Sequence, residues 1–169
     1  FEGKEAGGFP TVLIPRFTRI MSLRYGENPH QRAAIYAADD PGPSLARAKV
    51  HGGKELSYNN LNDLDAAWRM AADFEEPFAA VFKHASPCGA AVADNIRDAY
   101  QAAHDTDPLS AYGVIVALNR RVDLVCAKAL DETTFLECIL APGFDVDALE
   151  LLSHKKTRRY VEVPTMDLR

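Results

Sequence analysis

Residues 79–91, A-A-V-F-K-H-A-S-P-C-G-A-A, decide how the chain is interpreted, because an apolar run leads directly into two ionisable side chains and a turn. Residues 79–82 form the kind of short apolar segment that a sheet buries, and Pro87 and Gly89 predict where extended structure stops. Lys83 and His84 are therefore predicted at the carboxyl end of a strand, where open α/β sheets usually bind ligands. A Lys beside a His pairs a fixed cation with the one side chain that titrates near neutrality.

Two other interpretations of this stretch stay open from the residues alone. Most Lys-His pairs are a solvated charge beside a hydrogen-bonded loop histidine, and spacing does not distinguish this pair from those. A deaminase zinc site has His-x-Glu followed later by Pro-Cys-x-x-Cys. Here Ser86 stands where that Glu is needed, and Cys88 has no partner at Cys-x-x-Cys spacing, so the zinc pattern is incomplete.

Composition restricts the class of protein. With 169 residues, 47% hydrophobic and 25% charged, the chain predicts one globular domain with a sizeable core. A net charge of -5 argues against nucleic acid or an anionic membrane as the main partner, although a local basic pocket could hold a single phosphate. Three irregularly spaced cysteines favour a reducing compartment, and no apolar run approaches the ~20 residues that span a membrane. We therefore expect a cytoplasmic protein.

Strand and helix patterns alternate along the chain. Strands are predicted at residues 11–14, 33–38, 79–82, 114–118 and 136–140. Helices are predicted from residue 61 or 63 to 74, and at 90–104, 123–130 and 145–152, the last leading into a basic run at 154–159. This alternation predicts an α/β fold with helices on both faces of a mainly parallel or mixed sheet.

Polar segments beside these elements are candidate binding loops. Residues 23–31, L-R-Y-G-E-N-P-H-Q, place Arg24 and Tyr25 in a turn-rich loop where an arginine could meet a phosphate or carboxylate, or where the loop is simply solvated. Asn59 and Asn60 are expected just ahead of a helix N-terminus, as anion contacts or as caps. Residues 110–113 form a turn at the mouth of a strand.

Five segments occur together along the chain: L-R-Y-G-E-N-P-H-Q (23–31), G-K-E-L-S-Y-N-N-L-N-D-L-D-A-A (53–67), K-H-A-S-P-C-G (83–89), S-A-Y-G (110–113) and A-P-G-F (141–144). Through these segments, in this order, the chain from residue 9 onward resembles the bifunctional AICAR transformylase/IMP cyclohydrolase family, within its formyltransferase part. The resemblance implies transfer of a formyl group from 10-formyltetrahydrofolate to the 5-amino group of AICAR, giving FAICAR. It also implies a three-layer α/β/α, cytidine-deaminase-like fold, no catalytic metal, no bound cofactor besides the folate co-substrate, and a homodimer.

The resemblance assigns roles to nine residues. It implies that His84 is the general base and that Lys83 stabilises the oxyanion and helps to protonate the leaving amine. The implied contacts to AICAR come from Arg24 and Tyr25 on the phosphate and ribose side, Asn60 and Gly113 on the base and carboxamide, and Ser110, Tyr112 and Glu137 along the site. The chain departs from the family at Ser86, where Asn is common, and at Val114, where a second Gly is common.

The resemblance also predicts domain limits. Residues 1–22 are expected to connect to an upstream domain, residues 23–160 to form the first formyltransferase subdomain, and residues 161–169 to begin a linker to a second. On this view the chain is a fragment of a larger enzyme and is inactive alone. The alternative function is a non-catalytic half-domain that binds the AICAR nucleotide without turning it over.

Overall fold

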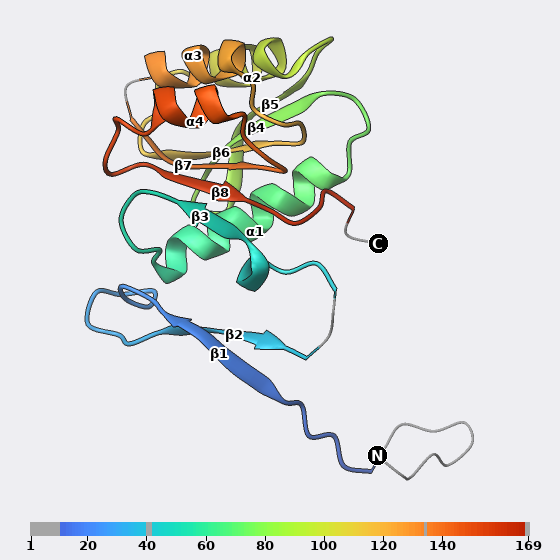
Figure 1. Cartoon of the computed structure of the whole chain (residues 1–169), viewed down its shortest axis with the longest axis vertical. Coiled ribbons are helices and arrows are strands. Elements are labelled where there is room, and N and C mark those ends of the chain that lie inside the picture. The colour runs from blue at the N-terminus through green and yellow to red at the C-terminus, as the bar shows by residue number, and fades with distance from the viewer. Residues whose placement is uncertain (1–10, 40–41, 134, 168–169) are drawn as a thin grey trace.

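The computed structural model describes residues 11–39, 42–133 and 135–167, in which helices cover both faces of a six-stranded sheet (Figure 1). The strand order is β3-β8-β7-β6-β4-β5. The strands are β1 (Phe17–Ser22), β2 (Ala34–Ala38), β3 (Lys49–His51), β4 (Phe78–Lys83), β5 (Ser86–Val92), β6 (Val114–Leu118), β7 (Leu136–Ala141) and β8 (Arg159–Glu162). The helices are α1 (Tyr58–Ala72), α2 (Ile96–Asp105), α3 (Leu124–Glu132), α4 (Val146–Leu152) and the short 3-10 helix η1 (Leu45–Arg47).

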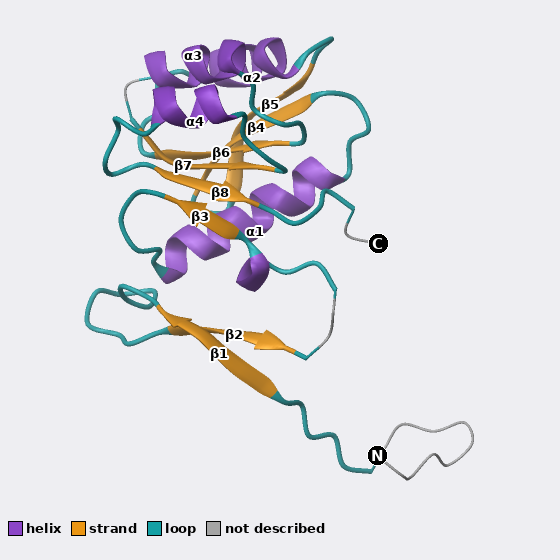
Figure 2. Ribbon diagram, viewed as in Figure 1, coloured by secondary structure: helices purple, strands orange, loops and turns teal. Residues whose placement is uncertain are grey.

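The sheet is mixed. Strands β6, β7 and β8 run parallel, whereas β4 is antiparallel to β6, β5 to β4 and β3 to β8. Helices α2, α3 and α4 lie on one face and α1 on the other, while β1 and β2 form a separate hairpin beyond α1 (Figure 2). The predicted three-layer α/β/α class with a mixed sheet is therefore confirmed.

Alternating side chains in the central strands build two cores. In β4, Ala79 and Val81 face the core under α2, α3 and α4, while Phe78, Ala80 and Phe82 face the core under α1. Strand β6 divides in the same way, and every residue of β6 is buried. Because both faces are covered, these strands are continuously apolar, which explains why their sequences identified them.

The segment after Lys83 differs from the prediction. Pro87 and Gly89 do not end extended structure but lie within β5, and α2 begins at Ile96 instead of residue 90. Strand β5 is an edge strand, where a proline costs no hydrogen bond to a neighbour. Gly89 is needed there for another reason, since a Cβ on it would lie 1.9 Å from the Ala103 carbonyl oxygen of α2.

Other elements also differ from the prediction. No strand forms at residues 11–14, and β1 instead begins at Phe17, beyond Pro15, where it pairs with β2. Helix α1 starts at Tyr58, one residue after its cap Ser57, so Asn59 and Asn60 lie inside its first turn. Strand β8 was not predicted, because its sequence begins in the basic run.

Some predicted limits lie partly outside the described residues. This holds for residues 1–10 of the expected connector, residues 40 and 41 of the loop before η1, and residues 168–169 of the expected linker. Within the described residues, no helix combines the length and apolar character required to cross a membrane.

Three buried groups should make the fold sensitive to alkali. Burial raises the pKa of Tyr100, Cys126 and Cys138 to about 12. Because the unfolded chain ionises these groups at their ordinary, lower pKa values, their contribution is complete below pH ~9 and is lost as the pH rises toward ~12.

We expect the free energy of unfolding to fall between those limits by up to about 1.4 kcal/mol per pH unit for each group. Urea titrations at a series of alkaline pH values measure how steeply the free energy of unfolding falls with pH. Cys138→Ala should reduce that slope by about the contribution of one ionisable group. A flat profile in the wild-type chain would contradict this.

Candidate functional site

His84 lies in a backbone conformation that side chains rarely adopt. Lys83 pairs with Ser86, so His84 and Ala85 form a two-residue hairpin loop between β4 and β5. Both have positive φ, 54° and 56°, as hairpins of this kind require. For residues other than Gly, Asn or Asp this costs about 1–2 kcal/mol each. Strain of this sort is found disproportionately at functional sites.

Asp63 of α1 holds the strained turn in place. Its Oδ1 accepts a hydrogen bond from the Ala85 amide at 2.7 Å. Partial burial is the main cause that raises the pKa of Asp63, and the nearby His84 and the Ala85 amide oppose that shift. The turn is therefore anchored on a half-buried carboxylate, and His84 itself is exposed.

The strand ends bring further candidates to the same edge of the sheet. Phe82 pairs with Ile115 across the antiparallel β4–β6 ladder, so Lys83 and His84 leave β4 where β6 begins. The Gly113 amide donates to the Phe135 carbonyl at 3.0 Å, which joins the starts of β6 and β7. The site thus combines the carboxyl end of β4 with the amino ends of β6 and β7. The rule that ligands bind at the carboxyl ends of parallel strands does not predict this arrangement, because β4 is antiparallel to β6.

Glu137 of β7 is fixed from two sides. Asn60 Nδ2 donates to Glu137 Oε2 at 3.0 Å, and Arg159 Nη1 lies 3.8 Å from the same oxygen. Arg159 is almost fully buried and also donates to the Lys54 and Glu55 carbonyls. The carboxylate is therefore presented in one orientation beside the first turn of α1.

Asn60 has a structural role as well. Ser57 and Asn60 form a capping box, in which the Ser57 side chain accepts from the Asn60 amide and Asn60 Oδ1 accepts from the Ser57 amide. Because Oδ1 is used by the cap and Nδ2 by Glu137, Asn60 links the helix start to β7. The cap and the site interpretation of Asn60 are thus compatible.

Arg24 and Tyr25 pack together near the same helix end. Arg24 Nη2 donates to the Tyr25 hydroxyl at 2.7 Å, and the guanidinium carbon lies 4.5 Å from the Tyr25 ring centre. The Arg24 amide donates to Leu56 and the Tyr58 amide to Tyr25, which tie the loop to the start of α1. The exposed Arg24 guanidinium is available to an anion.

The 110–113 turn leads directly into the start of β6. Ser110 is held by Asp107, and these hydrogen bonds lower the pKa of the Asp107 carboxyl. Tyr112 is exposed and packs on Phe135 with ring centres 5.1 Å apart, while Gly113 has φ 70°. Tyr112 lines a separate cavity of about 300 Å³ with Tyr100 and Glu132, and Arg24 is not among the described residues that line it.

The two departures from the family fall in different surroundings. Ser86 is exposed at the first position of β5, whereas Val114 is fully buried at the start of β6. Bulk at position 114 therefore enters the core under α2, α3 and α4. Gly113 keeps its left-handed conformation beside it.

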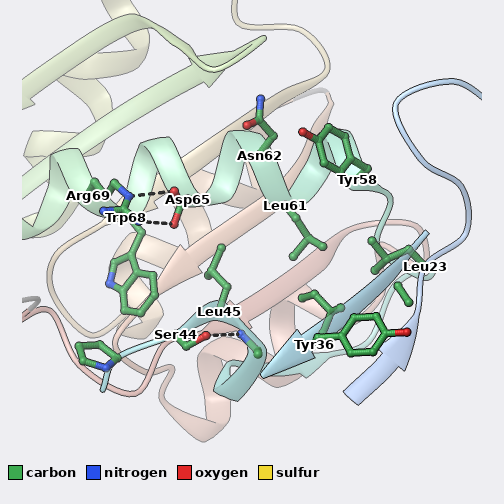
Figure 3. Close-up of a pocket in the computed structure, with 14 residues that line it drawn as sticks. Leu23, Tyr36, Ser44, Leu45, Tyr58, Leu61, Asn62, Asp65, Trp68 and Arg69 are labelled. Carbon is green, nitrogen blue, oxygen red and sulfur yellow. Dashed lines mark hydrogen bonds and ion pairs between the residues drawn. The ribbon is translucent and has the colours of Figure 1, made fainter. Parts of the chain in front are cut away.

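A larger cavity, of about 480 Å³, contains none of the nine candidate residues. It lies between α1 and the β1–β2 hairpin, and Figure 3 shows Leu61 of α1 and Tyr36 of β2 on its opposite walls. The Asp65–Arg69 ion pair, at 2.8 Å, lies along its α1 side. We favour the sheet edge as the site because the ionisable side chains gather there.

Metal-binding groups are not clustered in the described part of the chain, where no three His, Cys, Asp or Glu side chains are placed to hold an ion. The Cys88 thiol instead donates to the Val81 carbonyl at 3.4 Å, and burial raises its pKa.

Sequence reasoning missed two residues of this site. Asp63 was considered only as a helix-start residue, and Arg159 only as part of a basic run. The spacing S-x-x-N at 57–60 could have revealed the cap and so the true helix start. Nothing local indicates that Arg159 is buried.

Comparison with known proteins gives a consistent assignment. Residues 1–168 match the profile of the AICARFT/IMPCHase bienzyme family. The chain is 46% identical over 161 residues to the bifunctional purine biosynthesis protein PurH of Neisseria meningitidis, covering 95% of this chain and 31% of that protein. It is 47% identical over 163 residues to PurH of Magnetococcus marinus, covering 95% and 30%, and 48% identical over 160 residues to PurH of Lacticaseibacillus casei, covering 94% and 31%.

The chain thus spans about a third of the length of the curated relatives it matches. The profile match covers nearly every residue, including all nine candidate positions. On this evidence, the chain belongs to the AICARFT/IMPCHase bienzyme family.

Proposed function

We propose that this chain provides the catalytic Lys-His pair of a purine-biosynthetic formyltransferase, which transfers a formyl group from 10-formyltetrahydrofolate to the 5-amino group of AICAR. The observation that carries the proposal is the strained His84–Ala85 turn, anchored on Asp63 at a sheet edge that also holds Lys83 and Glu137. A strained, exposed histidine beside a cation is costly for folding and useful for proton transfer. Family membership supplies the class of reaction.

The chemistry requires a base and a cation. The 5-amine of AICAR is a weak nucleophile because its lone pair is delocalised into the imidazole carboxamide. As its nitrogen bonds to the formyl carbon, the neutral His84 imidazole takes the proton that the amine loses. The formyl oxygen becomes an oxyanion beside the Lys83 ammonium. When the bond between the formyl carbon and folate N10 breaks, N10 receives a proton from the Lys83 ammonium or from the His84 imidazolium.

The remaining candidates would position AICAR. Arg24 and Tyr25 would hold its phosphate and ribose, while Asn60 and Gly113 would face the base and carboxamide. Glu137, Ser110 and Tyr112 would complete the walls. Folate is a co-substrate in this scheme, and we expect no metal, no nucleic-acid partner, a homodimer and a cytoplasmic location.

A formyl-transfer assay tests the proposal. Residues 1–169 would replace the matching segment of the Neisseria meningitidis relative, and FAICAR formation would be followed from AICAR and 10-formyltetrahydrofolate. We expect turnover that depends on both substrates. Correctly folded chimeras that bind both substrates and form no FAICAR would contradict the assignment.

Arg24→Lys should weaken binding of the AICAR nucleotide by about tenfold, because lysine keeps the charge and loses the bidentate fork and the packing on Tyr25. The nucleoside without phosphate should bind the variant and the wild type equally. Calorimetric titration of the 169-residue chain with both ligands measures this, with Arg32→Lys as the matched control just outside the loop. Equal losses for the two ligands would place Arg24 away from the phosphate.

A further inference from the structure

A further pocket lies on the α4 face of the same sheet and shares no residue with the candidate site. Its volume is about 300 Å³, and it is bounded by the loop after β3 and the loop between α4 and β8. It is lined by His51, Gly52, Gly53, Leu149, Ser153, Lys155, Lys156 and Tyr160. The basic run at 154–159, which the proposed function leaves unused, supplies its two lysines.

The two lysines of this pocket, Lys155 and Lys156, have no ion-pair partner in the part of the chain that the structure describes. The Glu162 carboxylate is engaged at 3.0 Å by Nε2 of His51, a residue that lines the pocket. In a chain of net charge -5, two unpaired ammonium groups at a concave surface form a local positive potential.

The opposite wall offers backbone donors. Gly52 and Gly53 have φ of 67° and 81°, and within residues 42–133 and 135–167 neither amide has a hydrogen-bond acceptor. Space beside Gly52 is open, because no heavy atom lies within 4 Å of a Cβ built there. Gly53 is pressed against the residue just before β8, because a Cβ would lie 2.5 Å from the Arg158 carbonyl oxygen, so its loop is fixed.

We propose that this pocket binds a phosphate group, either of free phosphate or of a nucleotide. Two ammonium groups and two free amides are the donors that a tetrahedral dianion requires. The Ser153 hydroxyl donates to the Glu150 carbonyl, so it is not counted among them. Leu149 gives the pocket an apolar side that could contact a sugar or base.

The test is a phosphate titration of the 15N-labelled 169-residue chain at constant ionic strength. We expect the amide signals of Gly52 and Gly53 to shift saturably. Lys155→Gln with Lys156→Gln should weaken the binding at least about tenfold, since each lysine donates a charged hydrogen bond. The control, Lys49→Gln with Lys128→Gln, removes the same charge from exposed positions outside the pocket and should leave the affinity within about twofold, because exposed charges act weakly through salt.

Two results of the phosphate titration would contradict a phosphate site. Shifts that never saturate, or equal weakening by the two double variants, would overturn the proposal. Lysines that follow a helix can also stabilise its dipole. If that were their only role, the pocket variant would lower the melting temperature of the chain and leave the phosphate shifts unchanged.

Adenosine monophosphate identifies the source of the phosphate. Tighter binding than inorganic phosphate, with a shift of the Leu149 methyl signals, assigns a nucleotide, whereas weaker binding assigns free phosphate. If adenosine, which has no phosphate, shifts the Gly52 and Gly53 amide signals as strongly as adenosine monophosphate does, the pocket is not a phosphate site. Arg24→Lys should not change these shifts, so the pocket and the proposed formyltransferase site can fail separately.

Discussion

Replacing His84 by alanine is expected to lower kcat for formyl transfer by about 10² to 10⁴-fold, the usual effect of removing a general base. The KM for AICAR should change much less, because a base acts in the transition state more than in ground-state binding. Steady-state kinetics of the chimera described above measure both constants. His154→Ala, an exposed histidine at the end of α4, is the control for loss of an imidazole elsewhere.

The strained turn requires a second variant. Alanine at position 84 changes the chemistry and also leaves a non-glycine residue at φ 54°. Asparagine tolerates this conformation well and has no basic nitrogen, so His84→Asn keeps the turn and removes the base. If the imidazole is the base, both variants lose activity to a similar extent. An active His84→Asn enzyme would mean that His84 serves only the shape of the hairpin.

The sequence identified the strands whose own residues are continuously apolar. The predicted strands at 114–118 and 136–140 match β6 and β7 closely, because both faces of each strand are covered and the apolar run is continuous. The helices predicted at 123–130 and 145–152 match α3 and α4 within two residues. Local sequence was sufficient for these elements.

The elements that were missed depend on distant partners. Strand β8 begins with Arg159, whose burial is made possible by carbonyls of Lys54 and Glu55, more than a hundred positions earlier. The same limit applies to the site, where Asn60 and Glu137 are 77 positions apart and meet only through the fold. The resemblance to the family named both residues, but it did not predict their contact or the role of Asp63 as the anchor of the turn.

The second large effect is expected at Gly89, where the sequence predicted the end of extended structure and the structure has a residue inside β5. The sequence pattern predicts a turn at Gly89, whereas in the structure this glycine allows β5 to approach α2. A Cβ at position 89 would lie 1.9 Å from the Ala103 carbonyl oxygen, closer than real contacts allow. The obstructing atom is backbone inside a helix, so relief requires α2 and β5 to move apart.

Gly89→Ala is therefore expected to lower the free energy of unfolding by about 3 kcal/mol or more, at the upper end of the range for overpacked cores. Urea unfolding followed by circular dichroism measures this. Gly143→Ala is the matched control, because its Cβ would meet Nη1 of Arg121 at 2.3 Å, the far end of an exposed side chain that can swing away.

The control should lose only the contacts of the Arg121 guanidinium, which are the exposed ion pair with Asp145 and a hydrogen bond to the Phe144 carbonyl, together worth about 2 kcal/mol or less. Similar small losses for the two variants would mean that β5 and α2 separate easily. In that case the hairpin that carries His84 would not be held by the packing of β5 on α2, and its position would rest on the pairing of β5 with β4 and on the Asp63 hydrogen bond.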